Sequence, residues 1–201
     1  MILETLKSLR WADYFLYAII DPRELYRRIR QKDPDPFFLS FILPAAAALF
    51  DIMALSLTGA ETDFFYYKLS YGWILVFIYT VFKIVVYSSL VDVTAQFFGC
   101  RGNIREMLTI ANFSILPRVF FLPAFYLFAV IDFAPVFFYL FLSILFFIWY
   151  VLIFVQGLSE MHSIDFGKSF LIFILPAVFT GVVFFLCAVL LIITGVGFII
   201  S

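Results

Sequence analysis

Four ionisable side chains lie inside long apolar runs of the sequence: Asp51, Lys83, Asp92 and Arg118. A charge at the centre of a bilayer costs about 2.5 to 3.5 kcal/mol on insertion scales, so each of these residues is expected to face other helices or a water-filled cavity. A rise of about 1.5 Å per residue from the predicted cytoplasmic end of each run places Asp51 level with Lys83, and Asp92 within reach of Arg118. We therefore predict two ion pairs, Asp51 with Lys83 and Asp92 with Arg118, on opposite faces of a central second span.

A second group of residues could in principle bind a divalent metal ion. Glu160, His162 and Asp165 lie close together in one predicted loop. The histidine has no neighbouring histidine or cysteine, and the spacing matches no established metal site, so a solvated turn is the favoured interpretation. The sequence also contains no glycine-rich phosphate loop, nucleophile elbow or paired catalytic carboxylates. We predict no enzyme activity, no metal, no cofactor and no nucleic-acid partner.

The elements that position these residues are membrane-spanning helices. The chain is 65% hydrophobic and only 13% charged, whereas soluble domains are nearer one quarter charged. Apolar runs of about 20 residues match the thickness of a bilayer core. We predict an all-α integral membrane protein, a bundle of five transmembrane helices at 37–57, 70–98, 107–131, 134–157 and 169–199.

The residues before the first span form a separate segment in this interpretation. We assign 1–36 to a cytoplasmic segment, amphipathic over 1–10, and 37–201 to the five-span domain. Asp21 followed by Pro22, with Glu24 three residues after Asp21, is typical of a helix start. This pattern predicts a helix that continues to about Lys32.

Three basic residues share one face of that helix. Arg23, Arg27 and Arg30 could rest on anionic lipid, at on the order of 1 kcal/mol for each basic residue. The alternative is a helix whose basic face is simply solvated. The predicted partners are therefore the lipid bilayer, with anionic lipid at the N-terminal segment, and a second copy or another membrane protein.

The positions of lysine and arginine predict the orientation. Basic residues concentrate on the cytoplasmic side of membrane proteins. Ten of them fall on one side of the predicted spans: Lys7, Arg10, Arg23, Arg27, Arg28, Arg30, Lys32, Arg101, Arg105 and Lys168. We predict a multi-pass protein of the cell membrane, with its N-terminus cytoplasmic and its C-terminus outside.

A short motif recurs in three of the spans. Phe-Leu-Ser-Phe-Ile-Leu-Pro-Ala at 38–45 is repeated almost unchanged at 170–177, and Ile-Leu-Pro occurs again at 115–117. Proline removes a backbone hydrogen bond and disturbs the helix one turn earlier. We predict kinks at Pro44, Pro117 and Pro176 at similar depth, with chance similarity in an apolar chain as the alternative.

Two stretches resemble the Yip-domain family, named for Ypt/Rab-interacting membrane proteins. Residues 103–117 are similar to the polar segment and proline-containing third span of that family. The stretch from Trp149 to Pro176, with Gly157-Leu158, His162 and Lys168, resembles its fourth span, short loop and fifth span. The resemblance covers roughly residues 20–190.

The resemblance implies five spans, a cytoplasmic N-terminus and a role without catalysis. The eukaryotic members look like adaptors in vesicle trafficking that bind Rab-type GTPases through a longer N-terminal region. This chain lacks their Asp-Leu-Tyr-Gly-Pro type motif, which argues against a Rab-type GTPase as partner. It is more similar to short-tailed prokaryotic members.

Two function classes follow from the sequence. In a structural or adaptor protein of membrane organisation or trafficking, the intramembrane charges hold helices together. In a small transporter or channel, Asp51, Lys83, Asp92 and Arg118 line a polar path and the prolines act as hinges. Many transporters consist of two inverted halves, which five spans cannot form equally, so the first class is favoured.

Overall fold

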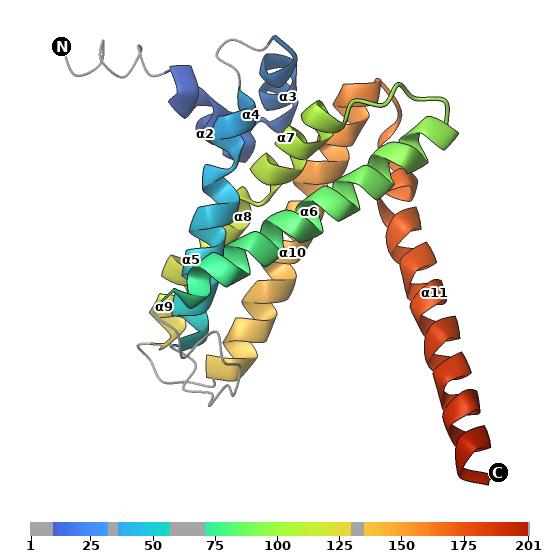
Figure 1. Cartoon of the computed structure of the whole chain (residues 1–201). Helices are drawn as coiled ribbons and strands as arrows, with labels where there is room; N and C mark the ends of the chain where they lie inside the picture. Colours follow the sequence, from blue (N-terminus) through green and yellow to red (C-terminus); the bar gives the residue numbers. More distant parts are fainter. Residues whose placement is uncertain (1–9, 32–35, 57–70, 130–134, 201) are drawn as a thin grey trace.

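The computed structural model describes residues 10–31, 36–56, 71–129 and 135–200, and within these ranges every regular element is a helix. The short helices are α2 (Arg10–Ile20), α3 (Pro22–Gln31), α4 (Pro36–Ser40), α5 (Ile42–Ser56), α7 (Ile104–Ser114), α8 (Leu116–Val119) and α9 (Phe121–Ala129). The long helices are α6 (Gly72–Phe97), α10 (Pro135–His162) and α11 (Phe166–Ile200). Figure 1 shows their arrangement.

Five helical stretches are long and apolar enough to cross a membrane: Pro36–Ala54, Gly72–Phe97, Ile104–Phe128, Val136–His162 and Phe166–Ile192. They confirm the predicted all-α bundle of five spans. The first combines α4 with α5, and the third combines α7, α8 and α9 (Figure 1). The end of the fourth span differs from the prediction, because α10 continues to His162 where a loop was expected from Ser159. Leu158 and Met161 are buried on this last turn, and their burial explains why the helix extends.

The third span is the central one. Of its most apolar 18-residue window, 61% is buried inside the protein, compared with 17% for the second span. The prediction that the second span is central is therefore wrong. The residues from Met107 to Pro117 are almost all buried, because α7 and α8 contact α3, α5, α6 and α10.

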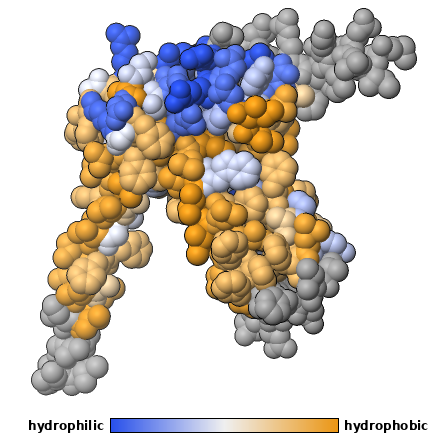
Figure 2. Space-filling view, turned by 180° about the vertical axis from the view of Figure 1, so that it is seen from behind, coloured by the Kyte–Doolittle hydropathy of each residue, from blue (hydrophilic) through white to orange (hydrophobic). Residues whose placement is uncertain are grey.

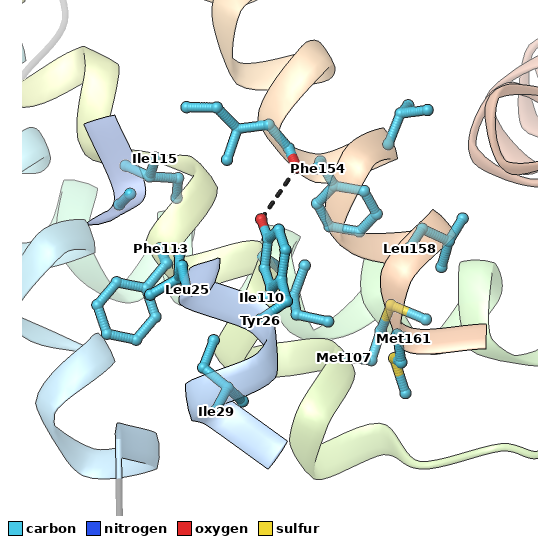
Figure 3. Packing of buried hydrophobic residues seen from close by; sticks show 14 of the residues in the cluster. Leu25, Tyr26, Ile29, Met107, Ile110, Phe113, Ile115, Phe154, Leu158 and Met161 are labelled. Atoms are coloured by element: carbon cyan, nitrogen blue, oxygen red, sulfur yellow. Dashed lines mark hydrogen bonds between the residues drawn. The ribbon is translucent and has the colours of Figure 1, made fainter. Parts of the chain in front are cut away.

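The N-terminal helices share the core of the spans. Leu25, Tyr26 and Ile29 of α3 belong to the same buried cluster as Met107 of α7 and Leu158 of α10 (Figure 3). Burial of each large apolar side chain contributes about 1.5 to 3 kcal/mol relative to exposure. The boundary at residue 36 consequently does not separate two hydrophobic cores. The predicted amphipathic segment 1–10 lies outside the described residues except for Arg10.

The last helix diverges from the bundle. Ser169, Ile172 and Phe173 at its start are buried, and α11 contacts α6 and α10. Beyond Pro176 the side chains from residue 177 to 188 are all exposed, and Figure 1 shows α11 leading away from the other spans. Apart from Thr180, whose hydroxyl bonds within the helix, these residues have no polar side chain, as expected for a helix surrounded by lipid.

Polar residues gather at one end of the molecule. Figure 2 shows a hydrophilic band across the top of the protein above largely hydrophobic flanks. The band includes α3, the segment 98–103 between α6 and α7, and the turn between α10 and α11. We call these three segments the polar platform.

Candidate functional site

Tyr26 anchors α3 to the spans. Its side chain is 4% exposed, and its hydroxyl group donates a hydrogen bond of 2.9 Å to the carbonyl oxygen of Ile153 on α10 (Figure 3). The hydroxyl also lies 3.4 Å from Oγ of Ser114 on α7. Burial raises the pKa of this phenol above its usual value, so the hydroxyl stays neutral and can donate.

Gly157 makes room for the Tyr26 ring. A Cβ atom at this position would lie 2.2 Å from Cζ of Tyr26, well inside van der Waals contact. The close packing of α3 on α10 thus depends on a residue without a side chain. In the sequence, Gly157 stands out only as part of the family resemblance.

The basic face of α3 is turned partly toward protein. Arg30 donates to the carbonyl oxygens of Glu160 and Met161 at the C-terminal end of α10, where helical carbonyls lack partners in the helix. Nε of Arg23 lies 3.7 Å from a carboxylate oxygen of Glu160. The prediction of one lipid-facing basic surface is corrected accordingly: Arg23 and Arg30 have protein partners, while lipid contact of Arg27 stays a prediction.

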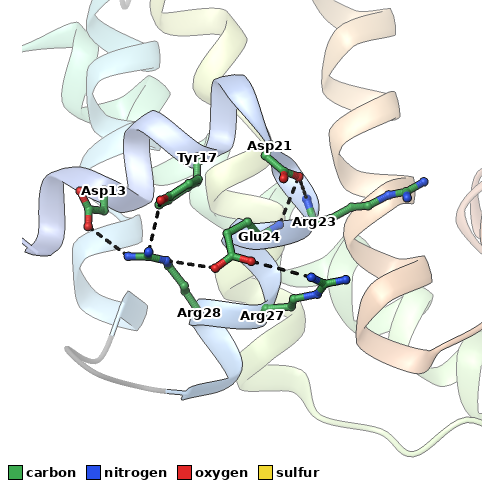
Figure 4. Close-up of polar contacts among 7 residues, drawn as sticks. All are labelled: Asp13, Tyr17, Asp21, Arg23, Glu24, Arg27 and Arg28. Carbon is green, nitrogen blue, oxygen red and sulfur yellow. Dashed lines mark hydrogen bonds and ion pairs between the residues drawn. The ribbon is translucent and has the colours of Figure 1, made fainter.

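A polar network joins α2 to α3 (Figure 4). The guanidinium group of Arg28 makes three contacts. Its Nη1 lies 3.0 Å from Oδ2 of Asp13, its Nη2 lies 3.2 Å from the hydroxyl oxygen of Tyr17, and its Nε lies 3.4 Å from Oε1 of Glu24. At the start of α3, Asp21 accepts hydrogen bonds from the backbone amides of Arg23 and Glu24, which confirms the predicted N-cap. Exposed ion pairs contribute little individually, but together these contacts fix the angle between the two helices.

Asp51 and Arg118 form an ion pair inside the bilayer region. The distance from Nη1 of Arg118 on α8 to Oδ2 of Asp51 on α5 is 2.6 Å. The predicted pairing of Asp51 with Lys83 is therefore wrong. The third span begins at Ile104 rather than 107, so Arg118 lies about 21 Å along it, level with Asp51 and about 5 Å deeper than expected.

Lys83 lies near this pair without joining it. Its Nζ is 4.7 Å from the ring centroid of Tyr79, one turn earlier on α6, and it interacts electrostatically with Asp51 and Arg118. Within the described ranges no carboxylate is within ion-pair distance of Lys83. The cluster of Asp51, Lys83 and Arg118 thus carries one positive charge in excess.

Asp92 lies at the polar end, and its predicted pairing with Arg118 is wrong. Its Oδ1 accepts a hydrogen bond of 3.0 Å from the amide of Asn103, and Oδ2 accepts one of 2.9 Å from Gln96. A Cβ at Gly102 would lie 2.9 Å from Asp92. The carboxylate therefore fixes the segment between α6 and α7, which passes directly over the last turn of α6.

Two of the three motif prolines follow a break in a helix. The first span is interrupted at Phe41, ahead of Pro44, and the third at Ile115, ahead of Pro117. At Pro176 the helix is continuous, and Oγ1 of Thr180 donates to the proline carbonyl. The predicted kink at Pro176 stays a prediction.

Two spans are also joined by an uncharged polar contact that the sequence did not lead us to predict. Nδ2 of Asn112 on α7 donates a hydrogen bond of 2.9 Å to Oγ of Ser40 on α4, and both side chains are fully buried. An asparagine in an apolar run is the available signal for such a contact, since a buried amide requires a partner. Tyr87 similarly joins α6 to α11 through a bond of 2.6 Å to the carbonyl of Phe173.

The metal-binding alternative gains no support from the described residues. His162 ends α10, and Oδ2 of Asp165 accepts from the amide of Gly167 at the start of α11. In the part of the chain that the structure describes, no three histidine, cysteine or acidic residues are grouped so that they could hold a metal ion. Cys100 and Cys187 are both free.

These features define a class of protein: an all-helical, multi-pass membrane protein with a polar platform built onto one end of its spans. A family model for the Yip1 domain matches residues 16–199, which is nearly the whole chain. The chain therefore belongs to the Yip1 domain family. No curated protein and no solved structure matches it.

Proposed function

We propose that this protein is a non-catalytic adaptor that uses its polar platform to hold a partner protein at the membrane. The partner is another membrane protein or a second copy of the chain. The polar platform faces the cytoplasm of a cell membrane, which leaves the C-terminus outside, in agreement with the distribution of lysine and arginine.

The observation that carries this proposal is the fixed position of α3. Tyr26 reaches into the core between α7 and α10, and Arg30 binds the end of α10. A preformed surface binds a partner without the entropic cost of ordering a flexible segment. Release of α3 from the spans would remove this preformed surface, so the docked helix is the part to test.

Site-specific photo-crosslinking in cells tests the proposal. A photoreactive amino acid replaces exposed Arg27 on the polar platform, and a matched variant carries it at Leu171 on the lipid-facing side of α11. We expect discrete protein adducts from position 27, and lipid adducts alone from position 171. Adducts of the same proteins from both positions, or no protein adduct from position 27, would contradict an adaptor role for this surface.

One observation favours the transporter alternative. At mid-membrane, Lys83 and Arg118 carry two formal positive charges against the one negative charge of Asp51. The excess positive charge is expected to contact protein or water. Asp92 does not belong to the same path, since it is bound to the segment between α6 and α7. Labelling of cysteines introduced at positions 83 and 118 by a water-soluble maleimide would support a water-filled path, and protection of both would exclude it.

A further inference from the structure

We infer that the polar platform contains a binding site for the phosphate-bearing headgroup of an anionic lipid. The site is a hollow of about 590 Å³, lined by the segment between α6 and α7 and by the turn between α10 and α11. Figure 1 shows these two segments at the same end of the molecule. It is separate from the α3 surface on which the adaptor proposal depends, although Arg30 borders both. The argument rests on the charge, the construction and the position of this hollow.

Cations dominate the lining of the hollow. Arg30, Arg101 and Lys168 line it, against the single carboxylate of Glu106. Arg30 is already bound to carbonyl oxygens of α10. Arg101 makes no ion pair within the described ranges, and Nζ of Lys168 lies 5.8 Å from the ring centroid of Phe98. Two cations are therefore available to an anion.

Other carboxylates close to the hollow are engaged elsewhere. Both oxygens of Asp92 accept hydrogen bonds, from Gln96 and from the amide of Asn103. Asp165 accepts from the amide of Gly167, and Glu160 pairs with Arg23. These carboxylates therefore compete only weakly with an external anion for Arg101 and Lys168.

The walls of the hollow are rigid. Gly99 has a φ of 83°, and the amide of Cys100 donates to the carbonyl of Ala95, which reverses the chain after α6. On the opposite wall, Oγ of Ser159 donates a hydrogen bond of 2.6 Å to the carbonyl oxygen of Ile164. A fixed cavity loses little entropy when a ligand binds.

The position of the hollow indicates a lipid rather than a free phosphate. Phe98 lines it, and Phe97 and Phe166 at the adjoining helix ends are exposed by 86% and 47%. Both α6 and α11 are apolar along the spans that begin at the hollow, and Figure 2 shows the apolar side chains of α11 below the polar band. A lipid can therefore place its phosphate between Arg101 and Lys168 while its acyl chains cover these aromatic side chains. Basic pockets between transmembrane helices bind anionic headgroups in this way.

Lipid titration of the full-length protein in detergent tests the inference. Bound phosphatidylglycerol and phosphatidylcholine are counted by native mass spectrometry. We expect a preference for phosphatidylglycerol that falls by about fivefold for each cation removed in Arg101→Gln/Lys168→Gln. The matched variant Arg101→Lys/Lys168→Arg keeps both charges at the same positions in the hollow and should retain the preference. Equal losses in both variants, or no preference in the unaltered protein, would overturn the site.

Cys100 provides a second measurement that needs no charge variant. It lines the hollow, whereas Cys187 lies on apolar α11. Phosphatidylglycerol should slow alkylation of Cys100 by a water-soluble maleimide, and phosphatidylcholine should not. Unchanged alkylation would contradict occupation of the hollow. Equal protection of Cys100 by glycerol 3-phosphate, at the same concentration as the lipid, would show that the hollow binds a free phosphate compound and would contradict a lipid as its ligand.

Discussion

The ring of Tyr26 occupies the space that a side chain at position 157 would need. An added Cβ at Gly157 would lie between 2.2 and 2.7 Å from three atoms of this ring. The ring cannot retreat easily, because its hydroxyl is bound to Ile153 and the residue is almost fully buried. The attachment of the N-terminal helices to the spans therefore depends on a glycine in the fourth span.

Gly157→Ala should weaken this attachment. The added methyl group forces Tyr26 or α10 to move, and overpacking of this kind costs about 1 to 3 kcal/mol. Thermal unfolding in detergent measures the change. Gly181→Ala is the matched control, since nothing lies within 4 Å of a Cβ there, and alanine is favoured over glycine in a helix by roughly 0.5 to 1 kcal/mol. Equal stability of the two variants would contradict the steric argument.

Asp92→Ala should release the segment between α6 and α7. The variant removes the acceptor of the Asn103 amide, a hydrogen bond to a charged group worth about 1.5 to 3 kcal/mol. Hydrogen exchange at Asn103 should become faster while the spans stay protected. Ser89→Ala is the control, because among the described residues its hydroxyl bonds to the carbonyl of Val85 on its own helix and to no other segment. Unchanged exchange at Asn103 would show that Asp92 does not hold the segment.

Pro117→Ala should make the third span more continuous. Alanine supplies the amide that proline lacks, so the bond to the carbonyl of Phe113 can form across the break at Ile115. Spin labels at exposed Ile104 and Leu127 should then move apart, as measured by electron paramagnetic resonance. Pro135→Ala should leave this distance unchanged. Pro135 is the first residue of α10, where a backbone amide has no partner within the helix, so its replacement adds no helical hydrogen bond. An unchanged distance in Pro117→Ala would mean that packing alone causes the break.

The five spans and the helix start at Asp21 were predictable because they depend on local properties. Long apolar runs and an Asp-Pro-x-Glu sequence specify helices without knowledge of their neighbours. The helix packing was less accessible. The burial of α3 against α10 depends on Tyr26 and Gly157, which are 131 positions apart and carry no mutual signal in one sequence.

The pairing of charges shows how small errors in span boundaries propagate. The third span starts three residues earlier than predicted, which shifts Arg118 by about 5 Å and brings it level with Asp51. Asp92 was placed at nearly the correct depth, but its partner is a backbone amide. Charged side chains alone cannot reveal such a partner.

The Asp51–Arg118 pair should show strong coupling in a double-mutant cycle. Asp51→Ala leaves Arg118 beside Lys83 without its carboxylate, and Arg118→Ala leaves Asp51 with only the more distant Lys83. A lone charge at this depth costs about 2.5 to 3.5 kcal/mol on insertion scales, so each single change should destabilise the protein by an amount of that order.

The double change Asp51→Ala/Arg118→Ala should cost less than the sum of the two single changes, because it leaves neither of the two charges alone. Unfolding in detergent or bilayer gives the three free energies. Lys83→Ala is the control: it removes a cation of the same cluster that makes no ion pair in the described ranges, so its coupling to Asp51 should be much weaker. Additive losses for Asp51 and Arg118, or equal coupling of Asp51 to Lys83, would contradict the pairing.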